Sequence, residues 1–244
     1  MRNELSKKGY QCEPIAIGVN TDAYQPLEKK LAITRQILEV LLETRHPAYL
    51  ITKSSLIERD TDLLVEMAQQ KLVSVCITIT TLDRKLARNL EPRATTPARR
   101  LQTLETLSAA GIPTRVSVSP VIPALNEEEI DNIVSAASRA GAQAAYAILL
   151  RLPHELQQLF PEWLEMHYPL RAARVMKAIR SVRNDNLNNA DFGARMIGSG
   201  PRADIIRQRF EAACKRAGLY VGRDFELDCS RFTPPGGARQ LTLI

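Results

Sequence analysis

The stretch EPIAIGVNTDAYQP (residues 13–26) decides the predicted fold, because in it an apolar run passes directly into a polar loop. Residues 14–18 are too few for a helix and lack the alternation of a half-exposed strand, so they predict a parallel strand covered on both faces. Four hydrogen-bonding side chains follow, those of Asn20, Thr21, Asp22 and Tyr24. In folds built from βα units this loop holds ligands, so the stretch predicts a site. An ordinary βα turn, which uses the same residue types, is the alternative.

The pattern of an apolar strand followed by a helix continues along the chain. We predict four further strands, within residues 46–53, 72–81, 114–123 and 144–150. Five strands alternating with helices predict an α/β fold with a parallel sheet, either doubly wound or an arc of a (β/α) barrel. No GxGxxG or GxxxxGK loop follows any strand, which counts against a dinucleotide-binding or P-loop enzyme. The barrel arc is therefore the preferred prediction.

Local signals place two of the intervening helices. Thr96, Pro97 and Gly111 are residue types typical of a helix cap, a first turn and a helix end, so they frame one helix. Asn126, followed three residues later by Glu129, predicts a capping box at the start of the next helix.

The strand pattern ends near residue 150, and helical patterns take its place. The segment TPPGGARQ near the C-terminus cannot form regular structure. We therefore predict a barrel core at residues 1–152, a C-terminal helical extension at residues 153–228 and a flexible tail at residues 229–244.

Composition narrows the class of protein. A chain of 244 residues, 45% of them hydrophobic, can bury a full core. No run approaches the ~18 apolar residues of a membrane span, and the start of the chain lacks the apolar core of a signal peptide, so we expect a cytoplasmic protein without a membrane partner. The cysteines lie too far apart for their spacing to specify a metal site. Cys76 and Cys214 are predicted to be buried, inert thiols, whereas Cys12 and Cys229 carry no such prediction.

The positive charge of the chain is concentrated in its C-terminal third. The formal net charge is +6, and residues 171–223 contain twelve Lys or Arg against four Asp or Glu. Within residues 171–183 the cations recur at every third position, which keeps most of them on one broad side of a helix. This region predicts a phosphate-rich partner such as nucleic acid; solvated helix faces are the alternative.

Several motifs in unbroken order carry a family resemblance. They are GVNTDAYQP, TKSSLIERD, TITTLDRKLARNLEPRA, SPVIPALNE, LLRLPHEL and FGARMIGSGP. Over residues 13–218 the chain resembles radical S-adenosylmethionine (radical SAM) proteins of the spore photoproduct lyase-like branch, also described as DNA repair photolyase-like. The resemblance implies a partial (β/α)6 barrel whose first strand leads into a CxxxCxxC loop that holds a 4Fe-4S cluster.

No CxxxCxxC motif precedes residues 14–18 in this sequence. The five predicted strands therefore match strands two to six of the family barrel, and we expect an N-terminally truncated chain. Three positioned thiolates are needed to hold the cluster, so no metal ligands are predicted here. A longer gene product or a second polypeptide that supplies the cluster segment would complete the enzyme.

The resemblance also implies a set of contacts to SAM. The loop with Asn20, Thr21 and Asp22 matches the binder of the methionine amino group, and Lys53 matches a lysine that meets the SAM carboxylate. Thr78, with Thr80 beside it, matches a position whose hydroxyl meets the ribose or the carboxylate.

Further implied contacts lie at later strand ends. Val121 and Arg151 belong to the strand ends that hold the adenine, and His154 follows at the last strand end. Glu91 and Arg93 are expected to form an ion pair that shapes the mouth of the site.

Three functions remain open from the sequence. The leading one is a radical SAM enzyme that cleaves SAM reductively to start a radical reaction on an unknown substrate, with nucleic acid as a candidate. A non-catalytic remnant, or a protein that binds a partner through its basic helices, is the second. A (β/α) barrel hydrolase, or an aldolase with Lys53 as a Schiff-base lysine, is the third, and five strands rather than eight count against it.

Overall fold

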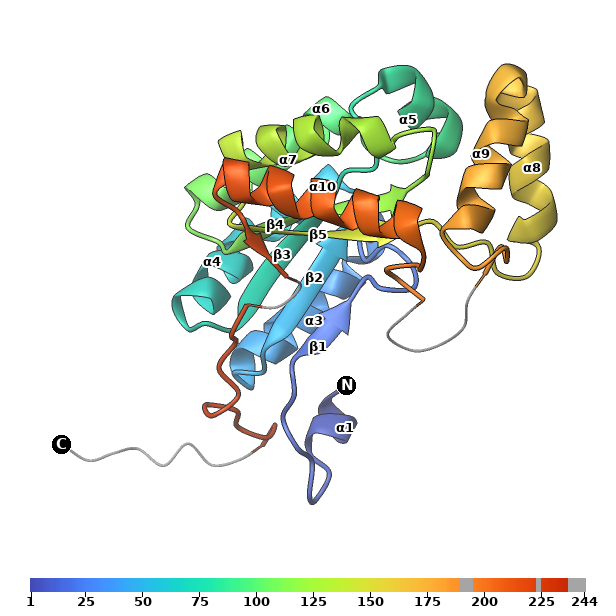
Figure 1. Cartoon of the computed structure of the whole chain (residues 1–244). Coiled ribbons are helices and arrows are strands. Elements are labelled where there is room, and N and C mark those ends of the chain that lie inside the picture. The colour runs from blue at the N-terminus through green and yellow to red at the C-terminus, as the bar shows by residue number, and fades with distance from the viewer. Residues whose placement is uncertain (189–194, 223–224, 237–244) are drawn as a thin grey trace.

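The computed structural model describes residues 1–188, 195–222 and 225–236. Six parallel strands form one sheet in which each strand pairs with the next along the chain (Figure 1). The strands are β1 (Ile15–Ile17), β2 (Ala48–Thr52), β3 (Val73–Thr78), β4 (Thr114–Val121), β5 (Ala144–Leu149) and β6 (Tyr220–Val221). A doubly wound sheet would reverse its strand order at a switch point. The unbroken order therefore confirms the α/β prediction and is the order of a partial (β/α) barrel.

The helical segments connect and cover these strands. They are α1 (Arg2–Leu5), α2 (Glu28–Leu31), α3 (Ile33–Glu43), η1 (Ser55–Asp60), α4 (Thr61–Gln69), α5 (Arg84–Leu90), α6 (Pro97–Ala109), η2 (Glu127–Glu129), α7 (Ile130–Arg139), α8 (Leu156–His167), α9 (Pro169–Ser181) and α10 (Pro201–Ala217). No helix in the described part of the chain is both long and apolar enough to cross a membrane.

The main core lies between the sheet and the helices α3, α4, α6, α7 and α10. Each of these helices contributes a fully or almost fully buried side chain to it, in order Leu38, Leu64, Leu104, Ile133 and Phe210. Within a helix the buried residues recur at helical spacing, as Ile130, Ile133, Val134 and Ala137 do in α7, and so form the apolar face of an amphipathic helix. Burial of this face holds the arc together.

The central strands are buried on both faces, as their apolar runs predict, but β1 is not: Ala16 is exposed at this edge of the sheet, so the prediction that residues 14–18 are covered on both faces is wrong. In β3 every residue is buried. Val75 and Ile77 belong to the core under the helices, whereas Thr78 points to the concave side and lines a cavity there. Because side chains alternate along a strand, the other residues of β3 face the concave side, which is the more polar of the two.

The region predicted as a helical extension has two separate parts. Helices α8 and α9 form a hairpin with a small core of its own, in which Phe160 and Val175 pack with Ile122 and Leu152 (Figure 1). Helix α10 instead packs against α7 and leads into β6, so it continues the alternation of the barrel. The sequence pattern does not predict β6, because its two residues are exposed and too few to show a period.

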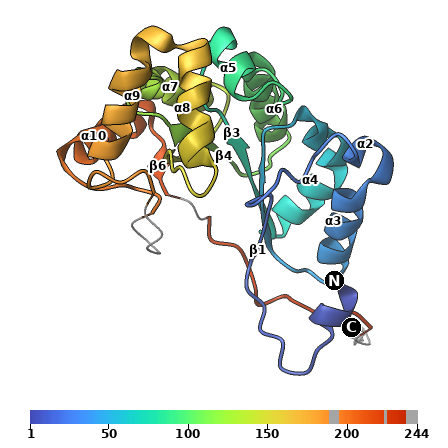
Figure 2. The ribbon, with the colours of Figure 1, turned by 90° about the vertical axis from the view of Figure 1, so that its right-hand side faces the viewer.

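The described part of the C-terminal segment, residues 225–236, has no helix or strand and lies against the N-terminal ends of the strands. The Tyr49 hydroxyl donates to the carbonyl of Phe225 at 2.6 Å. Farther along, the amide of Thr233 donates to the carbonyl of Thr44. Residues 229–236 of the predicted tail therefore pack on the body of the protein, beside α1 and opposite the α8–α9 hairpin (Figure 2).

The local helix signals had mixed outcomes. Helix α6 begins at Pro97 after Thr96, and Gly111 just beyond its end has φ +80°, as predicted. The predicted capping box is wrong, because the Asn126 side chain makes no cap bond. Its Oδ1 instead accepts from the backbone amide of Ile122, and its Nδ2 donates to the backbone carbonyl of Thr80. Glu129 accepts from the hydroxyl of Thr81. Both side chains connect neighbouring strand ends, which local spacing cannot show.

Candidate functional site

A cavity of about 430 Å³ lies on the concave side of the arc, at the C-terminal ends of the strands. Its walls come from β1 to β5, from the loops after β1 and β2, and from Met196. The sequence-predicted residues that line it are Asn20, Thr21, Asp22, Lys53 and Thr78. Residues from three separate strand ends therefore converge on one space, as the βα reading of the sequence requires.

The loop after β1 is fixed to the end of β2 by Asp22. One carboxylate oxygen accepts from the Thr52 hydroxyl at 2.6 Å, and the other accepts from the Lys53 amide at 2.7 Å. Gly18 lets the loop pass this close, because a Cβ there would lie 2.1 Å from the carbonyl oxygen of Ile51, and its φ is +93°. Asp22 thus positions Asn20, at the exposed rim of the cavity, and the carboxylate itself is occupied by these bonds.

Lys53 belongs to an ionic network centred on Glu91. The Lys53 ammonium lies 3.2 Å from one oxygen of Glu91, and the guanidinium of Arg100 lies 2.6 Å from the other. Arg100 is only 2% exposed and also donates to the carbonyls of Thr78 and Thr95. The expected pairing of Glu91 with Arg93 is replaced by these two partners.

Electrostatics keep Glu91 ionised in this network. Burial raises the pKa of Glu91, but the charges of Arg100 and Lys53 together with the hydrogen bonds of Arg100 and Thr80 outweigh burial, so its pKa lies below the ordinary value. A carboxylate held in this way orients the Lys53 ammonium at the cavity, where Lys53 keeps donors for a ligand.

The two predicted threonines have different surroundings. Thr78 lines the cavity with its side chain, and its hydroxyl makes no hydrogen bond among the described residues. Thr80 is 1% exposed, and its hydroxyl lies within donating distance of two acceptors, Glu91 Oε1 at 2.9 Å and the Ser119 carbonyl oxygen at 2.8 Å. Thr78 is therefore placed to contact a ligand, whereas Thr80 supports Glu91.

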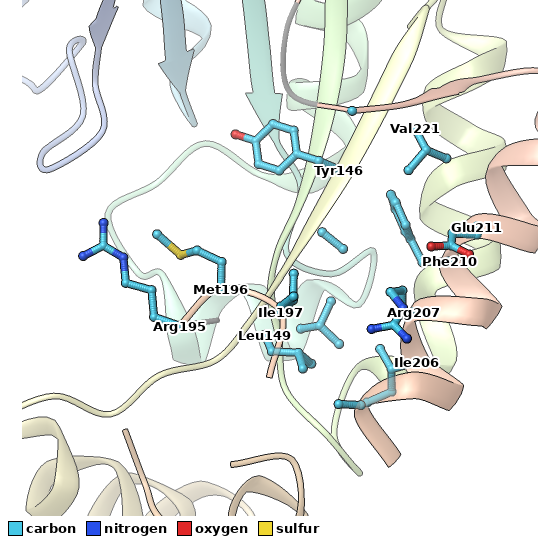
Figure 3. A pocket seen from close by; sticks show the side chains of 14 residues that line it. Tyr146, Leu149, Arg195, Met196, Ile197, Ile206, Arg207, Phe210, Glu211 and Val221 are labelled. Carbon is cyan, nitrogen blue, oxygen red and sulfur yellow. The ribbon is translucent and has the colours of Figure 1, made fainter. Parts of the chain in front are cut away.

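The two residues predicted for the last strand ends lie outside this cavity. Val121 is buried and lines an apolar pocket of about 400 Å³ between β5 and α10. Figure 3 shows Ile206 and Phe210 of α10 on one side of this pocket and Met196 and Tyr146 on the other. Because Met196 and Tyr146 also line the first cavity, the two spaces adjoin.

Arg151 follows β5 and lines neither space, and His154 is exposed just before α8. Near Arg151 the buried Arg183 donates to the carbonyls of Leu149, Leu150 and Arg195. Burial, and then the charge of Arg151, lower the pKa of Arg183 to about 10. Arg183 thus joins the end of β5 to the loop that carries Met196.

The residues at the floor of the cavity are not among those predicted from the sequence. Arg115 is 2% exposed and lies 4.7 Å over the ring of Tyr49, and Tyr146 accepts from the Cys76 thiol at 3.5 Å. Burial raises the pKa of Tyr146, and it raises that of Cys76 to about 11. Arg115 within the predicted strand at residues 114–123 was the available signal for this polar floor.

The cysteines do not fit a 4Fe-4S cluster at this end of the sheet. Cys76 and Cys214 are buried, as predicted, while Cys12 precedes β1 and Cys229 lies in the C-terminal segment, both at the opposite end. In residues 1–188, 195–222 and 225–236, no three His, Cys, Asp or Glu side chains are grouped to hold a metal ion. We therefore assign no step to a cluster in this chain.

Comparison with known proteins adds independent findings. Residues 4–137 match the family model described as the radical SAM superfamily. An uncharacterized protein of Mycobacterium tuberculosis strain H37Rv is 32% identical over 182 residues, which cover 74% of this chain and 54% of that protein. An uncharacterized protein of Methanocaldococcus jannaschii is 30% identical over 149 residues, covering 61% of this chain and 54% of the other. The chain spans about half the length of these curated relatives.

Solved structures show the same fold. Spore photoproduct lyase complexed with dinucleoside spore photoproduct superposes with a TM-score of 0.63 at 14% identity. A mutant of that enzyme with bound AdoMet and the dinucleoside superposes with a TM-score of 0.60 at 13% identity. Both matches cover 88% of this chain and 62% of the other. At this identity the likeness concerns the fold.

Proposed function

This chain belongs to the radical SAM superfamily, and from that premise we propose that it forms the SAM-binding part of an enzyme that cleaves SAM reductively to start a radical reaction. The observation that carries the proposal is the convergence of Asn20, Thr21, Lys53 and Thr78 on one cavity at the strand ends. When bound, SAM supplies a sulfonium whose reductive cleavage begins radical chemistry.

The donors of the cavity suit the polar groups of SAM. Lys53 offers an ammonium to the carboxylate, and a charge-assisted bond of this kind is about twice as strong as a neutral one. Asn20 and Thr21 offer side-chain oxygens to the amino group, and the Thr78 hydroxyl can donate or accept at the ribose. Asp22 and Glu91 act indirectly in this proposal: Asp22 fixes the loop after β1, and Glu91 fixes the ammonium of Lys53.

The cluster ligands are proposed to lie outside these residues. The chain covers about half of its curated relatives, so a longer form of the protein or a second polypeptide is the proposed source of the thiolates. A Schiff-base role for Lys53 has less support, because an ammonium held by Glu91 at 3.2 Å is a poor nucleophile.

SAM binding tests the assignment directly. Equilibrium dialysis of the chain with labelled SAM should show saturable binding, and Lys53→Ala should weaken it by about 10-fold or more, because losing a charge-assisted contact costs about 1.5 to 3 kcal/mol. The matched control is Lys30→Ala, which removes an exposed lysine of α2 outside the cavity. Equal affinities for Lys53→Ala and Lys30→Ala would remove Lys53 from the site. No binding by the parent would favour the non-catalytic alternative.

We also propose nucleic acid as a partner, and the observation that favours it is the row of cations on α9. Arg171, Arg174, Lys177 and Arg180 are all exposed, and none forms a salt bridge with a residue that the structure describes. The hairpin of α8 and α9 packs on residues that follow β4 and β5, so it stands at the cavity end of the sheet. A known protein of the same fold, spore photoproduct lyase, binds a dinucleoside photoproduct, which supports this choice of partner.

Most other cations of the predicted basic region are occupied. Arg202 pairs with Glu127, and both Arg209 and Arg216 pair with Asp131. Arg183 is buried beneath the end of β5, and Arg223 lies outside the described residues. The proposed surface is therefore restricted to α9, rather than extending over all of residues 171–223.

A binding titration at several salt concentrations tests this surface. For duplex DNA the slope of log affinity against log salt is about −0.9 for each phosphate contact. Reversing Arg174, Lys177 and Arg180 to Glu together should weaken binding and flatten the slope by about 3. The control is Arg207→Glu on α10, a cation already paired with Asp204, which should leave the slope almost unchanged. If the triple variant keeps the parent slope, nucleic acid does not bind at α9.

A further inference from the structure

The segments near the two ends of the chain meet at the N-terminal end of the sheet, far from the cavity. Three rings from different segments pack there: the Tyr10 ring lies 5.8 Å from His46 and 5.5 Å from Phe232, and His46 and Phe232 lie 5.3 Å apart. The Tyr10 hydroxyl is also 2.8 Å from His46 Nε2. This contact does not depend on either cysteine.

Each of the two segments is fixed on both sides of a cysteine. In the C-terminal segment, the amide of Asp228 donates to the carbonyl of Lys71 and the amide of Thr233 to that of Thr44, so Cys229 lies between two anchors. In the N-terminal segment, Cys12 lies between Tyr10 and β1, whose first amide, that of Ile15, donates to Pro47. Short tethers between fixed points leave both cysteines little freedom to separate.

This arrangement makes Cys12 and Cys229 neighbours: both are half-buried free cysteines, and Cys229 lies close enough to help raise the pKa of the Cys12 thiol. We propose that Cys12 and Cys229 form a redox pair, which a small-molecule disulfide such as oxidised glutathione converts into an intramolecular disulfide that ties the N-terminal segment to the C-terminal one.

The reaction balances as two thiol–disulfide exchanges. The Cys229 thiolate attacks oxidised glutathione, forms a mixed disulfide and releases one glutathione thiolate. The Cys12 thiolate then attacks the Cys229 sulfur, forms the protein disulfide and releases the second glutathione. The two protein thiols lose two protons and two electrons, and one oxidised glutathione is reduced to two glutathione molecules.

The surroundings of Cys12 set the rate of the second exchange. Burial, and then the neighbouring Cys229, raise the pKa of Cys12 to about 12, so little thiolate is present at neutral pH. We expect slow closure at neutral pH and faster closure as the pH rises.

The disulfide would hold residues 225–236, the segment that lies against the N-terminal end of the sheet. Phe225, four residues before Cys229, accepts from the Tyr49 hydroxyl, and its ring lies 5.9 Å from the Arg115 guanidinium. Arg115 in turn lines the floor of the cavity. Oxidation at the N-terminal end of the sheet would therefore fix a wall that extends to the site.

The test treats the reduced chain with oxidised glutathione under native conditions and then blocks remaining thiols before peptide mapping without reductant. We expect a linked pair of peptides that contain Cys12 and Cys229, and a rise in Tm on oxidation. Cys12→Ser and Cys229→Ser should each give no linked pair and no rise in Tm. Cys229→Ser should also leave Cys12 nearly unmodified, whereas Cys12→Ser should accumulate glutathione on Cys229.

Cys214→Ser serves as the control, because Cys214 lies on the buried face of α10 and should not affect the link. Three outcomes would overturn the proposal: glutathione on both Cys12 and Cys229 of the parent without a link, cross-linked dimers in place of the intramolecular disulfide, or two unmodified thiols after exposure at alkaline pH. Each readout is independent of SAM binding, so failure here leaves the proposed function untouched.

Discussion

The Lys53 ammonium and the Glu91 carboxylate lie 3.2 Å apart, although Lys53 follows β2 and Glu91 follows α5. Glu91 also binds Arg100, which is almost fully buried. This relationship connects the stability of the barrel to the placement of the one lysine that lines the cavity, because the same carboxylate serves both cations.

Glu91→Gln should destabilise the protein strongly. The substitution leaves the charge of Arg100 buried without its carboxylate, and breaking a buried pair from one side costs about 3 kcal/mol or more. Urea unfolding measures this loss. The matched control is Glu58→Gln, whose partner Arg99 is 38% exposed, and it should lose about 1 kcal/mol or less. Equal losses for the two variants would contradict the central role of Glu91.

The same carboxylate predicts a pH dependence of stability. In the folded protein the pKa of Glu91 lies below 4.5, its ordinary value in the unfolded chain. Between the folded and the unfolded pKa, the unfolded chain therefore binds more protons than the folded one. The stabilisation is therefore fully present above pH 4.5 and is lost as the pH falls through the folded pKa. Unfolding free energies measured across this acid range should decrease less steeply in Glu91→Gln than in the parent. If the unfolding free energies of the two proteins fall in parallel, other carboxylates cause the loss of stability in acid.

Substitutions of Thr78 and Thr80 should have different effects, the first on SAM binding and the second on the stability of the protein. Thr78→Val removes a hydroxyl from the cavity wall and should weaken SAM binding by about 1 kcal/mol, or about fivefold. Thr80→Val removes a hydroxyl bonded to Glu91 and should lower the free energy of unfolding by a similar amount. Dialysis and urea unfolding on both variants measure the two effects. A Thr80→Val protein that binds SAM more weakly than Thr78→Val would reverse the assignment.

Gly18→Ala should disrupt the loop after β1. The added Cβ would lie 2.1 Å from the carbonyl oxygen of Ile51 at a φ of +93°, so the loop must move away from β2. Gly111→Ala is the control, because it has a similar φ of +80° but no atom within 4 Å of the added Cβ, and the strain alone costs about 1 to 2 kcal/mol. We expect a clearly larger loss of stability at Gly18. Similar losses would show that the close approach to Ile51 is easily relieved.

Much of the arc could be predicted because its signals are local. Each of the five longer strands lies within a segment that the sequence predicts as a strand, and α6 begins and ends at the cap residues that precede and follow it in the chain. Loops at the C-terminal ends of parallel strands meet at one edge, so Asn20, Lys53 and Thr78 could be assigned to one site. The strand β6 could not be predicted, because two exposed residues have no detectable period.

The sequence by itself determined the order of the first five strands and the helices between them, the family and the group of polar residues at the strand ends. Only the tertiary structure decided the partners of these residues: Glu91 pairs with Lys53 and Arg100, and three arginines of α10 pair with acids of α7 and η2 while the cations of α9 stay exposed. The reason is physical. Periodicity records which face of an element is buried, whereas an ion pair depends on how distant elements are brought together when the sheet curves.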